Sequence, residues 1–439
     1  MRLWQRKGAM FRLGRSTAQA SSRMATTAGW WVLGGAFVGF AVSGGMMHAY
    51  AVFFVAFLEE FGWNRAETST AYAVAQLMSG VSAPLIGLLV DRLGPRRLIL
   101  AGGSLLVGGL LLSASVATLW HLVLLYGVVM TVGANGLGMV VSVPLISRLF
   151  DRKRGMAVAI VQSANGLGRA VSTPLVQLLI AALGWRQSYL VLAAVMAMCL
   201  GPVAWCFPRR EPERRVPAPS ESAGPAGGRP AGAAAPAVQD WRVRDAMRTP
   251  HFWLLGSVYL CTGLGSFFVS LHQLAFAVDM GFDKLYAASV LGIGSFLAIG
   301  GIIGTGTLSD YIGRELAAIL AYGISILGVV CALLITGPEQ RWLLWLHACC
   351  FGLTWGARGP SITAKTVDLF PGRHVGAILG GISIGTGLGA AIGSWASGWI
   401  FDRSGSYHLA FLLSIASYLV GCVAFWRLRR PPVRHGHAG

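Results

Sequence analysis

The chain has few charged residues, and acidic ones are the scarcest. Only 12% of its 439 residues are charged, with 17 Asp and Glu against 35 Lys and Arg, whereas a water-soluble protein has about 25%. Cysteine is sparse too: seven residues, all in apolar runs, without the spacing of metal ligands or of a disulfide framework. These shortages exclude a soluble globular protein and a secreted disulfide scaffold. We expect no metal site, no cofactor and no enzymatic activity.

Hydrophobic residues and glycine are abundant instead. The chain is 55% hydrophobic with 59 glycines, and its mean hydropathy is +0.63. A membrane-spanning helix needs about 20 mainly apolar residues, and twelve such runs are present: 30–58, 70–90, 98–117, 121–149, 155–183, 188–207, 251–278, 286–308, 316–336, 342–364, 375–400 and 407–426. The sequence therefore predicts an all-α polytopic membrane protein with twelve transmembrane helices.

The net charge of +18 would suggest nucleic-acid binding in a soluble protein. Here the charges lie in predicted loops, and with both termini inside, 28 Lys and Arg fall in cytoplasmic segments and 5 in external ones. Such a bias predicts cytoplasmic amino and carboxyl termini and no nucleic-acid partner. The expected parts are a basic tail (1–29), a six-helix half (30–207), a proline-rich disordered cytoplasmic linker (208–248), a second half (249–428) and a tail (429–439). Translation could also start at Met10 or Met24 rather than Met1.

The two halves repeat each other at a nearly constant offset. Gly87, Asp91 and Gly94 recur as Gly306, Asp310 and Gly313, each 219 residues later. The run Gly-Leu-Gly at 166–168 recurs at 387–389, 221 residues later. A duplicated six-helix unit in parallel orientation is a transporter architecture.

Segment 87–97, GLLVDRLGPRR, resembles the loop 2–3 signature of the major facilitator superfamily, and its repeat in loop 8–9 is present. Pro95 departs from the basic residue usual there. Further motifs at 29–31, 60–67, 152–157 and 248–253 are similar to monocarboxylate-transporter-like and oxalate/formate-antiporter-like proteins. The charged residue that these often carry in helix 8 is missing from residues 287–308.

The resemblance implies a twelve-helix fold whose helices 1, 2, 4, 5, 7, 8, 10 and 11 line a central cavity. The resemblance also implies a cytoplasmic latch, a set of contacts that breaks when the inner side opens. Alternatively, the same residues only cap helix ends and supply the charges that set membrane orientation. The latch residues would be Asp91, Arg92, Gly87, Gly94, Arg96 and Arg97, with Asp310, Gly306, Gly313 and Arg314 in the second half.

Two arginines, Arg169 in helix 5 and Arg358 in helix 10, lie in the interior of predicted spans, away from their ends, whereas all 17 carboxylates fall outside the spans. A buried arginine is costly unless it meets a partner or a polar cavity, and it can hold a carboxylate through two hydrogen bonds. The missing negative charge predicts an anionic substrate. The alternative is a structural clamp between helices.

Other polar side chains in the spans are weaker candidates for substrate binding. His48 and His272 are the histidines placed to relay protons. Asn165 and Gln162 share a face of helix 5, and Tyr50 and Gln273 lie in helices 1 and 7. Each of these six could instead join helices by hydrogen bonds.

These features predict a secondary transporter of the bacterial inner membrane, monomeric in the lipid bilayer. We expect it to move a small organic anion, a monocarboxylate or short dicarboxylate, by proton symport or by anion exchange. Efflux of an anionic or amphipathic compound is the alternative within the class. A membrane sensor on a transporter fold, which transports nothing, is the alternative outside it.

Overall fold

The computed structural model describes residues 29–150, 154–208, 241–372 and 374–428. Over these ranges the chain is helical, and no residue in them lies in a β-strand. Eleven helical spans in this part are long and apolar enough to cross a bilayer, and three of them contain a short break. The remaining predicted span, 342–364, is the tenth in the chain and is divided into α15 (Arg341–Thr354) and α16 (Arg358–Leu369), each of which is short by itself. The all-α fold with twelve membrane-crossing segments is confirmed.

The amino-terminal half contains the first six crossing segments. Residues 29–48 and α2 form the first of them, and α5, the π-helix η1, α6 and α7 together form the fourth. The elements are α2 (Tyr50–Phe61), α3 (Arg65–Leu93), α4 (Pro95–Ser113), α5 (Leu119–Leu122), η1 (Val123–Met130), α6 (Thr131–Asn135), α7 (Met139–Leu149), α8 (Arg154–Leu183) and α9 (Trp185–Cys206).

The carboxyl-terminal half repeats this order. Helices α11 and α12 form segment 7, and α15 and α16 form segment 10. The elements are α10 (Val243–Met247), α11 (Pro250–Ser270), α12 (Gln273–Asp279), α13 (Lys284–Ile312), α14 (Arg314–Leu333), α15, α16, α17 (Val375–Ser404) and α18 (His408–Arg427).

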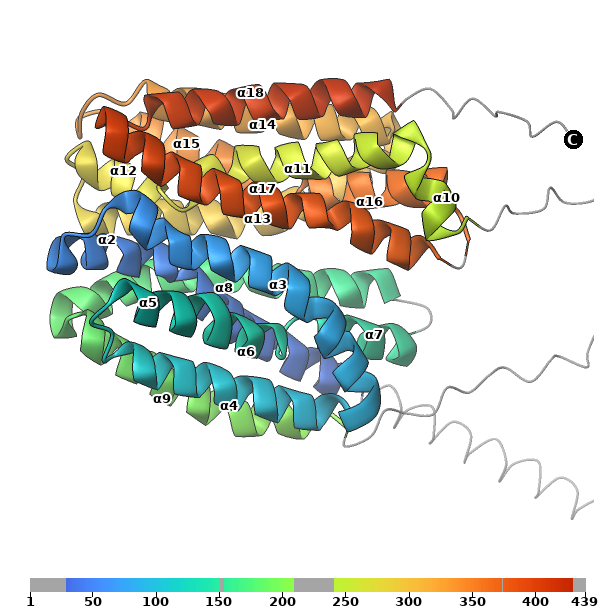
Figure 1. Cartoon of the computed structure of the whole chain (residues 1–439), viewed down its shortest axis with the longest axis horizontal. Helices are drawn as coiled ribbons and strands as arrows, with labels where there is room; N and C mark the ends of the chain where they lie inside the picture. Colours follow the sequence, from blue (N-terminus) through green and yellow to red (C-terminus); the bar gives the residue numbers. More distant parts are fainter. Residues whose placement is uncertain (1–28, 151–153, 209–240, 373, 429–439) are drawn as a thin grey trace, which may run out of the picture.

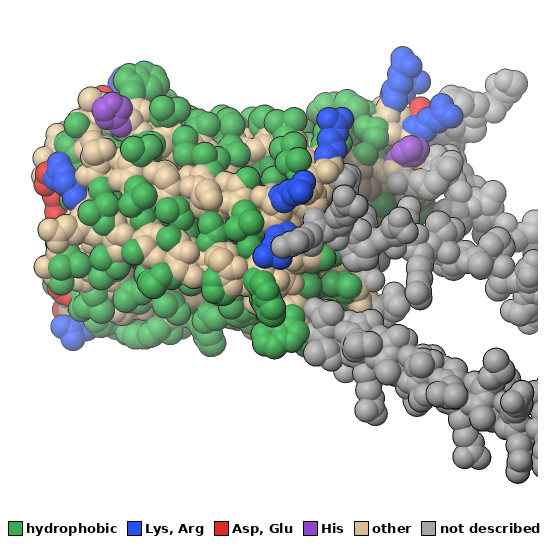
Figure 2. Space-filling view, turned by 90° about the horizontal axis from the view of Figure 1, so that it is seen from below, with side chains coloured by type: hydrophobic (Ala, Val, Ile, Leu, Met, Phe, Trp, Pro, Cys, Tyr) green, Lys and Arg blue, Asp and Glu red, His purple; other side chains and the backbone are tan. Residues whose placement is uncertain are grey.

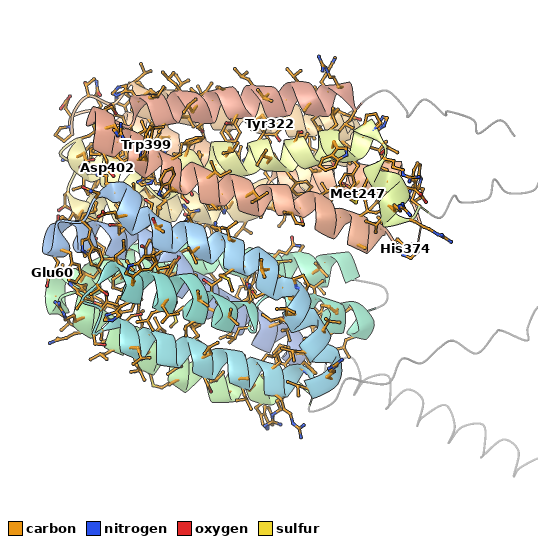
Figure 3. The ribbon with its side chains drawn as sticks, viewed as in Figure 1. Glu60, Met247, Tyr322, His374, Trp399 and Asp402 are labelled. Atoms are coloured by element: carbon orange, nitrogen blue, oxygen red, sulfur yellow. The ribbon has the colours of Figure 1, made fainter. Side chains whose placement is uncertain are left out.

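The two halves lie side by side. Segments 8 (α13) and 11 (α17) of the carboxyl-terminal half contact segments 5 (α8) and 2 (α3) of the amino-terminal half. Helix α17 packs along α3, and α13 packs along α8. We call the end that holds residues 29 and 428 the tail end, and the end that holds loops 62–64 and 280–283 the distal end. In Figure 3, Glu60 and Asp402 mark the distal end, and Met247 and His374 mark the tail end.

Helices 1, 4, 7 and 10 are interrupted at matching places in the two repeats. The helix breaks fall at Ala49, at residues 136–138, at residues 271–272 and at residues 355–357. In segment 10 the break includes Gly356, whose φ of +76° suits glycine and few other residues. In segment 4 it follows the π-helix η1, a deviation common at functional sites. Discontinuous helices of this kind line the substrate sites of transporters.

The repeated glycine motif also has the same conformation in both halves. Gly94 joins α3 to α4 with φ +79°, and Gly313 joins α13 to α14 with φ +92°. A Cβ on Gly87 would lie 3.9 Å from Val140 of α7, and one on Gly306 would lie 3.9 Å from Pro360 of α16. Gly87 and Gly306 therefore occupy equivalent positions, each beside the helix that follows the break in segment 4 or segment 10.

The last part of the predicted linker 208–248 is folded. Within it, α10 packs on α11, with Ala246 fully buried and Trp241 edge-on to Phe370 at a ring distance of 5.4 Å. The folded second half thus begins before residue 249. Residues 1–28, 209–240 and 429–439, which hold most of both predicted tails and of the linker, lie outside the described residues.

The outer surface is apolar across its middle. Figure 2 shows hydrophobic side chains over the midsection, with most Lys, Arg, Asp and Glu gathered toward the two ends. Val81, Met198 and Val420 expose 62%, 68% and 56% of their area. Exposing such a continuous apolar band to water would be unfavourable, whereas the hydrocarbon core of a bilayer provides an apolar environment for it.

Candidate functional site

Two cavities lie between the halves. The first, which we call the polar cavity, has a volume of about 20 Å³ and is lined by His48, Ala51, Tyr72, Arg169, Thr173, Ser270, Leu271, Gln273, Leu274, Leu291 and Ser295. The second, which we call the aromatic cavity, has a volume of about 420 Å³, and its lining includes Phe40, His48, Tyr72, Gln76, Ser79, Tyr126, Asn135, Asn165, Phe267 and Trp355. His48 and Tyr72 line both cavities, so the two adjoin.

Arg169 projects from α8 into the polar cavity. Its guanidinium lies over the ring of Trp355, 4.6 Å from the centroid, and so contacts the break in segment 10 of the opposite half. Among the described residues the guanidinium has no carboxylate partner and donates no hydrogen bond. An arginine inside a membrane protein is normally paired. The guanidinium of Arg169 therefore keeps free donors that face the polar cavity.

His48 and Asn165 form a pair beside this arginine. The His48 Nε2 lies 3.0 Å from the Asn165 Oδ1, which joins segment 1 to α8. Because an amide oxygen only accepts, Nε2 carries the proton of this hydrogen bond. The structure thus brings three predicted candidates, Arg169, His48 and Asn165, to one place where the cavities meet.

Four aromatic rings lie one after another along the aromatic cavity, beginning at the ring that Arg169 contacts. We call them the aromatic wall. The Trp355 ring meets Phe267 at a centroid distance of 5.4 Å, Phe267 meets Tyr72 at 6.0 Å, and Tyr72 stacks with Tyr126 at 6.2 Å. Trp355 and Phe267 belong to the carboxyl-terminal half, and the two tyrosines belong to the amino-terminal half. The wall therefore crosses the interface between the halves.

Arg358 lies elsewhere, contrary to the expectation that it faces the central cavity. Its side chain is buried between α11, α14 and α18, where Nη1 donates to Ser325 Oγ at 2.6 Å and Nη2 donates to Ser266 Oγ at 3.1 Å. The guanidinium carbon is 5.0 and 4.8 Å from the rings of Tyr322 and Tyr418. Arg358 lines neither cavity, because α16 turns it toward helices 9 and 12 of its own half.

The remaining polar candidates have separate positions. Gln273 lines the polar cavity, whereas Gln162 lines neither cavity. The Tyr50 hydroxyl donates to the Thr68 carbonyl at 2.7 Å, and the Tyr50 ring stacks on Tyr126 at 4.0 Å, so Tyr50 lies behind the aromatic wall. Gln76, a further polar candidate from the second predicted span, lines the aromatic cavity, and its amide has no hydrogen-bond partner among the described residues.

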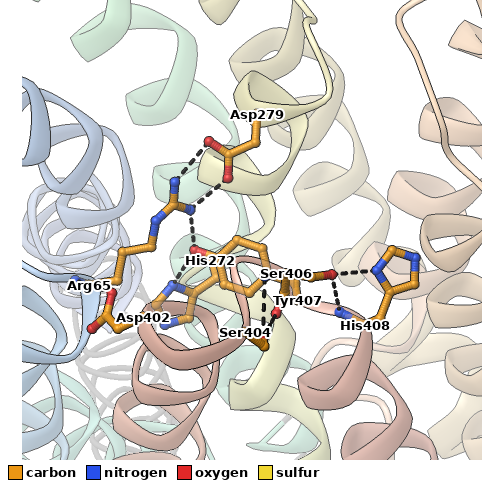
Figure 4. Close-up of polar contacts among 8 residues, drawn as sticks. All are labelled: Arg65, His272, Asp279, Asp402, Ser404, Ser406, Tyr407 and His408. Carbon is orange, nitrogen blue, oxygen red and sulfur yellow. Dashed lines mark hydrogen bonds and ion pairs between the residues drawn. The ribbon is translucent and has the colours of Figure 1, made fainter.

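His272 lies at the distal end, in a network that joins the halves (Figure 4). Its Nε2 donates to the Ser394 carbonyl at 2.8 Å and also lies 3.3 Å from Ser69 Oγ of the opposite half. Its Nδ1 is 3.1 Å from the Tyr407 hydroxyl. The imidazole is fully buried here and lines neither cavity.

Arg65 and Asp402 form the rest of this network. The Arg65 guanidinium makes a two-pronged ion pair with Asp279, with N to O distances of 2.7 and 2.8 Å, and it also contacts the Tyr407 hydroxyl. The Asp402 carboxylate accepts from the backbone N–H groups of Arg65 and Ala66, at 3.0 and 2.8 Å. A carboxylate of one half thus caps the amino terminus of α3 in the other, a favourable place for negative charge.

A second ion pair, Lys284 with Glu59, also joins the halves at the distal end. Among the described residues, every ion pair between the halves lies at this end. Along α3, Ser69 belongs to the network, whereas Tyr72, Gln76 and Ser79 farther toward the tail end line the aromatic cavity. The structure is therefore closed on the distal side of the cavities.

The predicted latch residues lie at the tail end. Asp310 pairs with Arg314 at 2.6 Å, and Arg314 Nε is 3.8 Å from Asp368, all within the carboxyl-terminal half. The side chain of Asp91 is outside the described part. Arg92, Arg96 and Arg97 make no ion pair with the residues that the structure describes. The latch predicted from the resemblance remains a prediction.

The family model of the Major Facilitator Superfamily matches residues 35–366 and 351–439. The chain belongs to the major facilitator superfamily. Its resemblance to monocarboxylate transporters is confirmed as well. Monocarboxylate transporter 13 of Bos taurus is 25% identical over 393 residues, covering 90% of this chain and 87% of the relative. Monocarboxylate transporter 11 of Homo sapiens is 27% identical over 416 residues, covering 92% and 83%.

Among solved structures, that of a mutant of the nucleoside transporter NupG superposes with a TM-score of 0.70 at 13% identity. The match covers 92% of this chain and 100% of the NupG chain, which confirms the fold. Family and relatives together indicate a membrane transporter rather than an enzyme.

Proposed function

We propose that this transporter carries a small organic anion, a monocarboxylate or a short dicarboxylate, by alternating access. The observation that carries the proposal is the guanidinium of Arg169, which faces the polar cavity without a carboxylate partner among the described residues. A substrate carboxylate would supply the missing charge through two parallel hydrogen bonds. The similarity to monocarboxylate transporters supports the same substrate class.

Arg169 is the arginine that we assign to the substrate, and Arg358 is the one that we assign to structure. Ser266 and Ser325 occupy donors of Arg358, and two tyrosine rings cover its faces. Arg169 has one face on Trp355 and free donors. Because Trp355 belongs to the opposite half, an anion held by Arg169 lies where both halves can respond to it.

The charge bias supports a membrane orientation with both termini cytoplasmic and the distal end external. In that orientation the network around Arg65 closes the outside, and the cavities belong to an inward-facing or occluded state. Opening the outside would require the Arg65–Asp279 and Lys284–Glu59 pairs to separate. The latch around Asp91 and Asp310 would form as the tail end closes. The Ala-, Gly- and Arg-rich composition supports a bacterial inner membrane, and we propose that the protein acts there as a monomer.

His48 is the residue that we assign to proton coupling. It lines both cavities, hydrogen-bonds to Asn165 and lies beside Arg169, so a proton on its free nitrogen would share the site with the anion. His272, in the distal network, is placed for gating rather than for substrate contact. Proton symport is our first assignment, and anion exchange is the second.

The test is thermal stabilisation of the detergent-purified protein by a panel of lactate, pyruvate, oxalate, formate, succinate and aromatic acids. A ligand that binds only the native state raises the melting temperature. We expect a shift that disappears in Arg169→Met and survives in Arg358→Lys, which keeps a cation among the serines. A shift that survives in Arg169→Met would refute the assignment of Arg169. Stabilisation by amphipathic compounds alone, with no response to any acid, would favour efflux.

A further inference from the structure

The two adjoining cavities differ in size and in chemistry. The polar cavity has room for about one small polar group, since a single water needs about 10–15 Å³. The aromatic cavity, at about 420 Å³, is within the range of about 300–1,000 Å³ typical of sites that enclose drug-sized ligands. A site with this division suits a molecule with a compact charged head and a larger body.

The lining residues provide a single permanent charge. Arg169 is the one Lys, Arg, Asp or Glu among the described residues that line the two cavities. A second carboxylate on the substrate would therefore enter the aromatic cavity without a cation to meet it. Desolvating an unpaired carboxylate is costly, so the charge of the lining favours a monoanion over a dianion.

The aromatic wall indicates what the body of the molecule is. Trp355, Phe267, Tyr72 and Tyr126 follow one another with ring distances of 5.4 to 6.2 Å, starting at the ring that covers Arg169. Flat groups bind well against such a surface through edge-to-face and offset-stacked contacts. The carboxylate of a small acid such as lactate would occupy the polar cavity, and its short body would leave most of this wall without an apolar partner.

From this arrangement we infer that the substrate is a monocarboxylate whose body is an aromatic or similarly flat apolar group. This inference rests on the proposed function and narrows it. The carboxylate occupies the polar cavity at Arg169, and the ring lies against Phe267 and Tyr72. The unpaired amide of Gln76 also lines the aromatic cavity and can accept or donate a hydrogen bond to a hydroxyl or keto group on the body.

The position of the wall also links ring binding to the transport cycle. Phe267 and Trp355 belong to one half, and Tyr72 and Tyr126 belong to the other. A ring held among them would contact both halves at once, as the carboxylate at Arg169 would, because residues of both halves line the polar cavity too. The ring would therefore add to the contacts by which the substrate joins the two halves.

The inference is tested by equilibrium binding to the full-length purified protein, with matched acids that differ only in a phenyl group. The pairs are phenyllactate with lactate and phenylpyruvate with pyruvate, and succinate serves as the diacid. We expect each phenyl acid to bind at least about tenfold more tightly than its partner, because ring stacking and burial both favour it. We expect succinate to bind more weakly than the phenyl acids.

Variants of the aromatic cavity then test where the phenyl ring of the substrate binds. Phe267→Leu should weaken phenyllactate binding by a larger factor than lactate binding and so remove most of the advantage of the phenyl acid, whereas Phe296→Leu, at an exposed position on α13, should change neither affinity. Ala83→Phe, which fills part of the aromatic cavity from α3, should weaken phenyllactate selectively and does not depend on how Phe267→Leu folds.

Equal affinity for lactate and phenyllactate, or tightest binding of succinate, would overturn the inference. The proposed function would still stand in either case if the binding disappears in Arg169→Met. Binding of every acid that is insensitive to Arg169→Met would instead overturn both.

Discussion

The distal network offers a perturbation whose size can be worked from the structure. Arg65 holds the halves together through its ion pair with Asp279, its contact with the Tyr407 hydroxyl and its position 3.7 Å above the Phe401 ring. A hydrogen bond to a charged group contributes about 1.5–3 kcal/mol, and a cation–π contact at a partly exposed site adds about 0.5–1 kcal/mol. Since the Arg65 and Asp279 side chains are 14% and 29% exposed, we take the lower part of these ranges.

Arg65→Met should therefore destabilise the distal-closed state by about 2–3 kcal/mol. Because about 1.4 kcal/mol is a tenfold change in an equilibrium constant, the ratio of closed to open protein falls about 30- to 150-fold. The assay is pulsed electron paramagnetic resonance between spin labels at Gln187→Cys and Glu339→Cys, in the two halves at the distal end. The seven native cysteines are replaced first. We expect a longer distance to gain population.

The matched control is Arg186→Met. Arg186 also forms a distal ion pair, with Glu60 at 2.7 Å, but both residues belong to the amino-terminal half. This change should leave the distance distribution as it is in the parent protein. An unchanged distribution in Arg65→Met, or the same shift in Arg186→Met, would refute the reasoning that contacts between the halves hold the distal end closed.

Two further predictions concern stability. Arg358→Met removes two hydrogen bonds to serines and two ring contacts, so the free energy of unfolding should fall by about 2–4 kcal/mol and the melting temperature by several degrees. The melting temperature of Arg358→Lys should fall less. Equal melting temperatures for the parent and Arg358→Met would contradict the role of Arg358 as a clamp between helices. Gly301→Ala should destabilise the protein, because a Cβ there would collide with the Leu353 carbonyl oxygen. At the neighbouring position, a Cβ in Gly300→Ala meets nothing within 4 Å, so this variant should be as stable as the parent. Similar melting temperatures for the two alanine variants would count against this packing.

Much of the fold could be predicted from the sequence because its signals are local and repeated. Apolar runs of spanning length give the helices, and the Gly, Asp, Gly motif at a constant offset gives the duplication. The same motif fixes backbone conformation, as the positive φ of Gly94 and Gly313 illustrates. The division of segment 10 is signalled only weakly, by Gly356 and Pro360 near its middle.

The site was harder to predict, because the rotation of a helix about its axis decides where a side chain points. Arg169 and Arg358 have the same chemistry and both lie within spans, yet one faces a cavity and the other faces Ser266 and Ser325. The two serines come from α11 and α14, and nothing in the local sequence around Arg358 specifies them. Arg358 is the first residue of α16, directly after the break at residues 355–357.

The distal network depends on contacts that are still farther apart along the chain. Arg65 and Asp402 are separated by 337 residues, and each reads in the sequence as an ordinary loop charge. His272 reads as a possible proton relay within a span, although the fold places it between Ser394 and Tyr407 in this network. The packing of α17 on α3 brings Asp402 to Arg65, and the packing of α11 on α17 brings His272 to Ser394.

The central claim is that Arg169 holds the substrate anion, and saturable uptake into proteoliposomes tests it most directly. A radiolabelled monocarboxylate that stabilises the purified protein is offered to vesicles containing the parent protein, Arg169→Met or Arg358→Lys, each scaled to the amount of folded protein. We predict that saturable uptake disappears in Arg169→Met and persists in Arg358→Lys. Uptake that persists in Arg169→Met and disappears in a folded Arg358→Lys would contradict the account and assign the anion to Arg358.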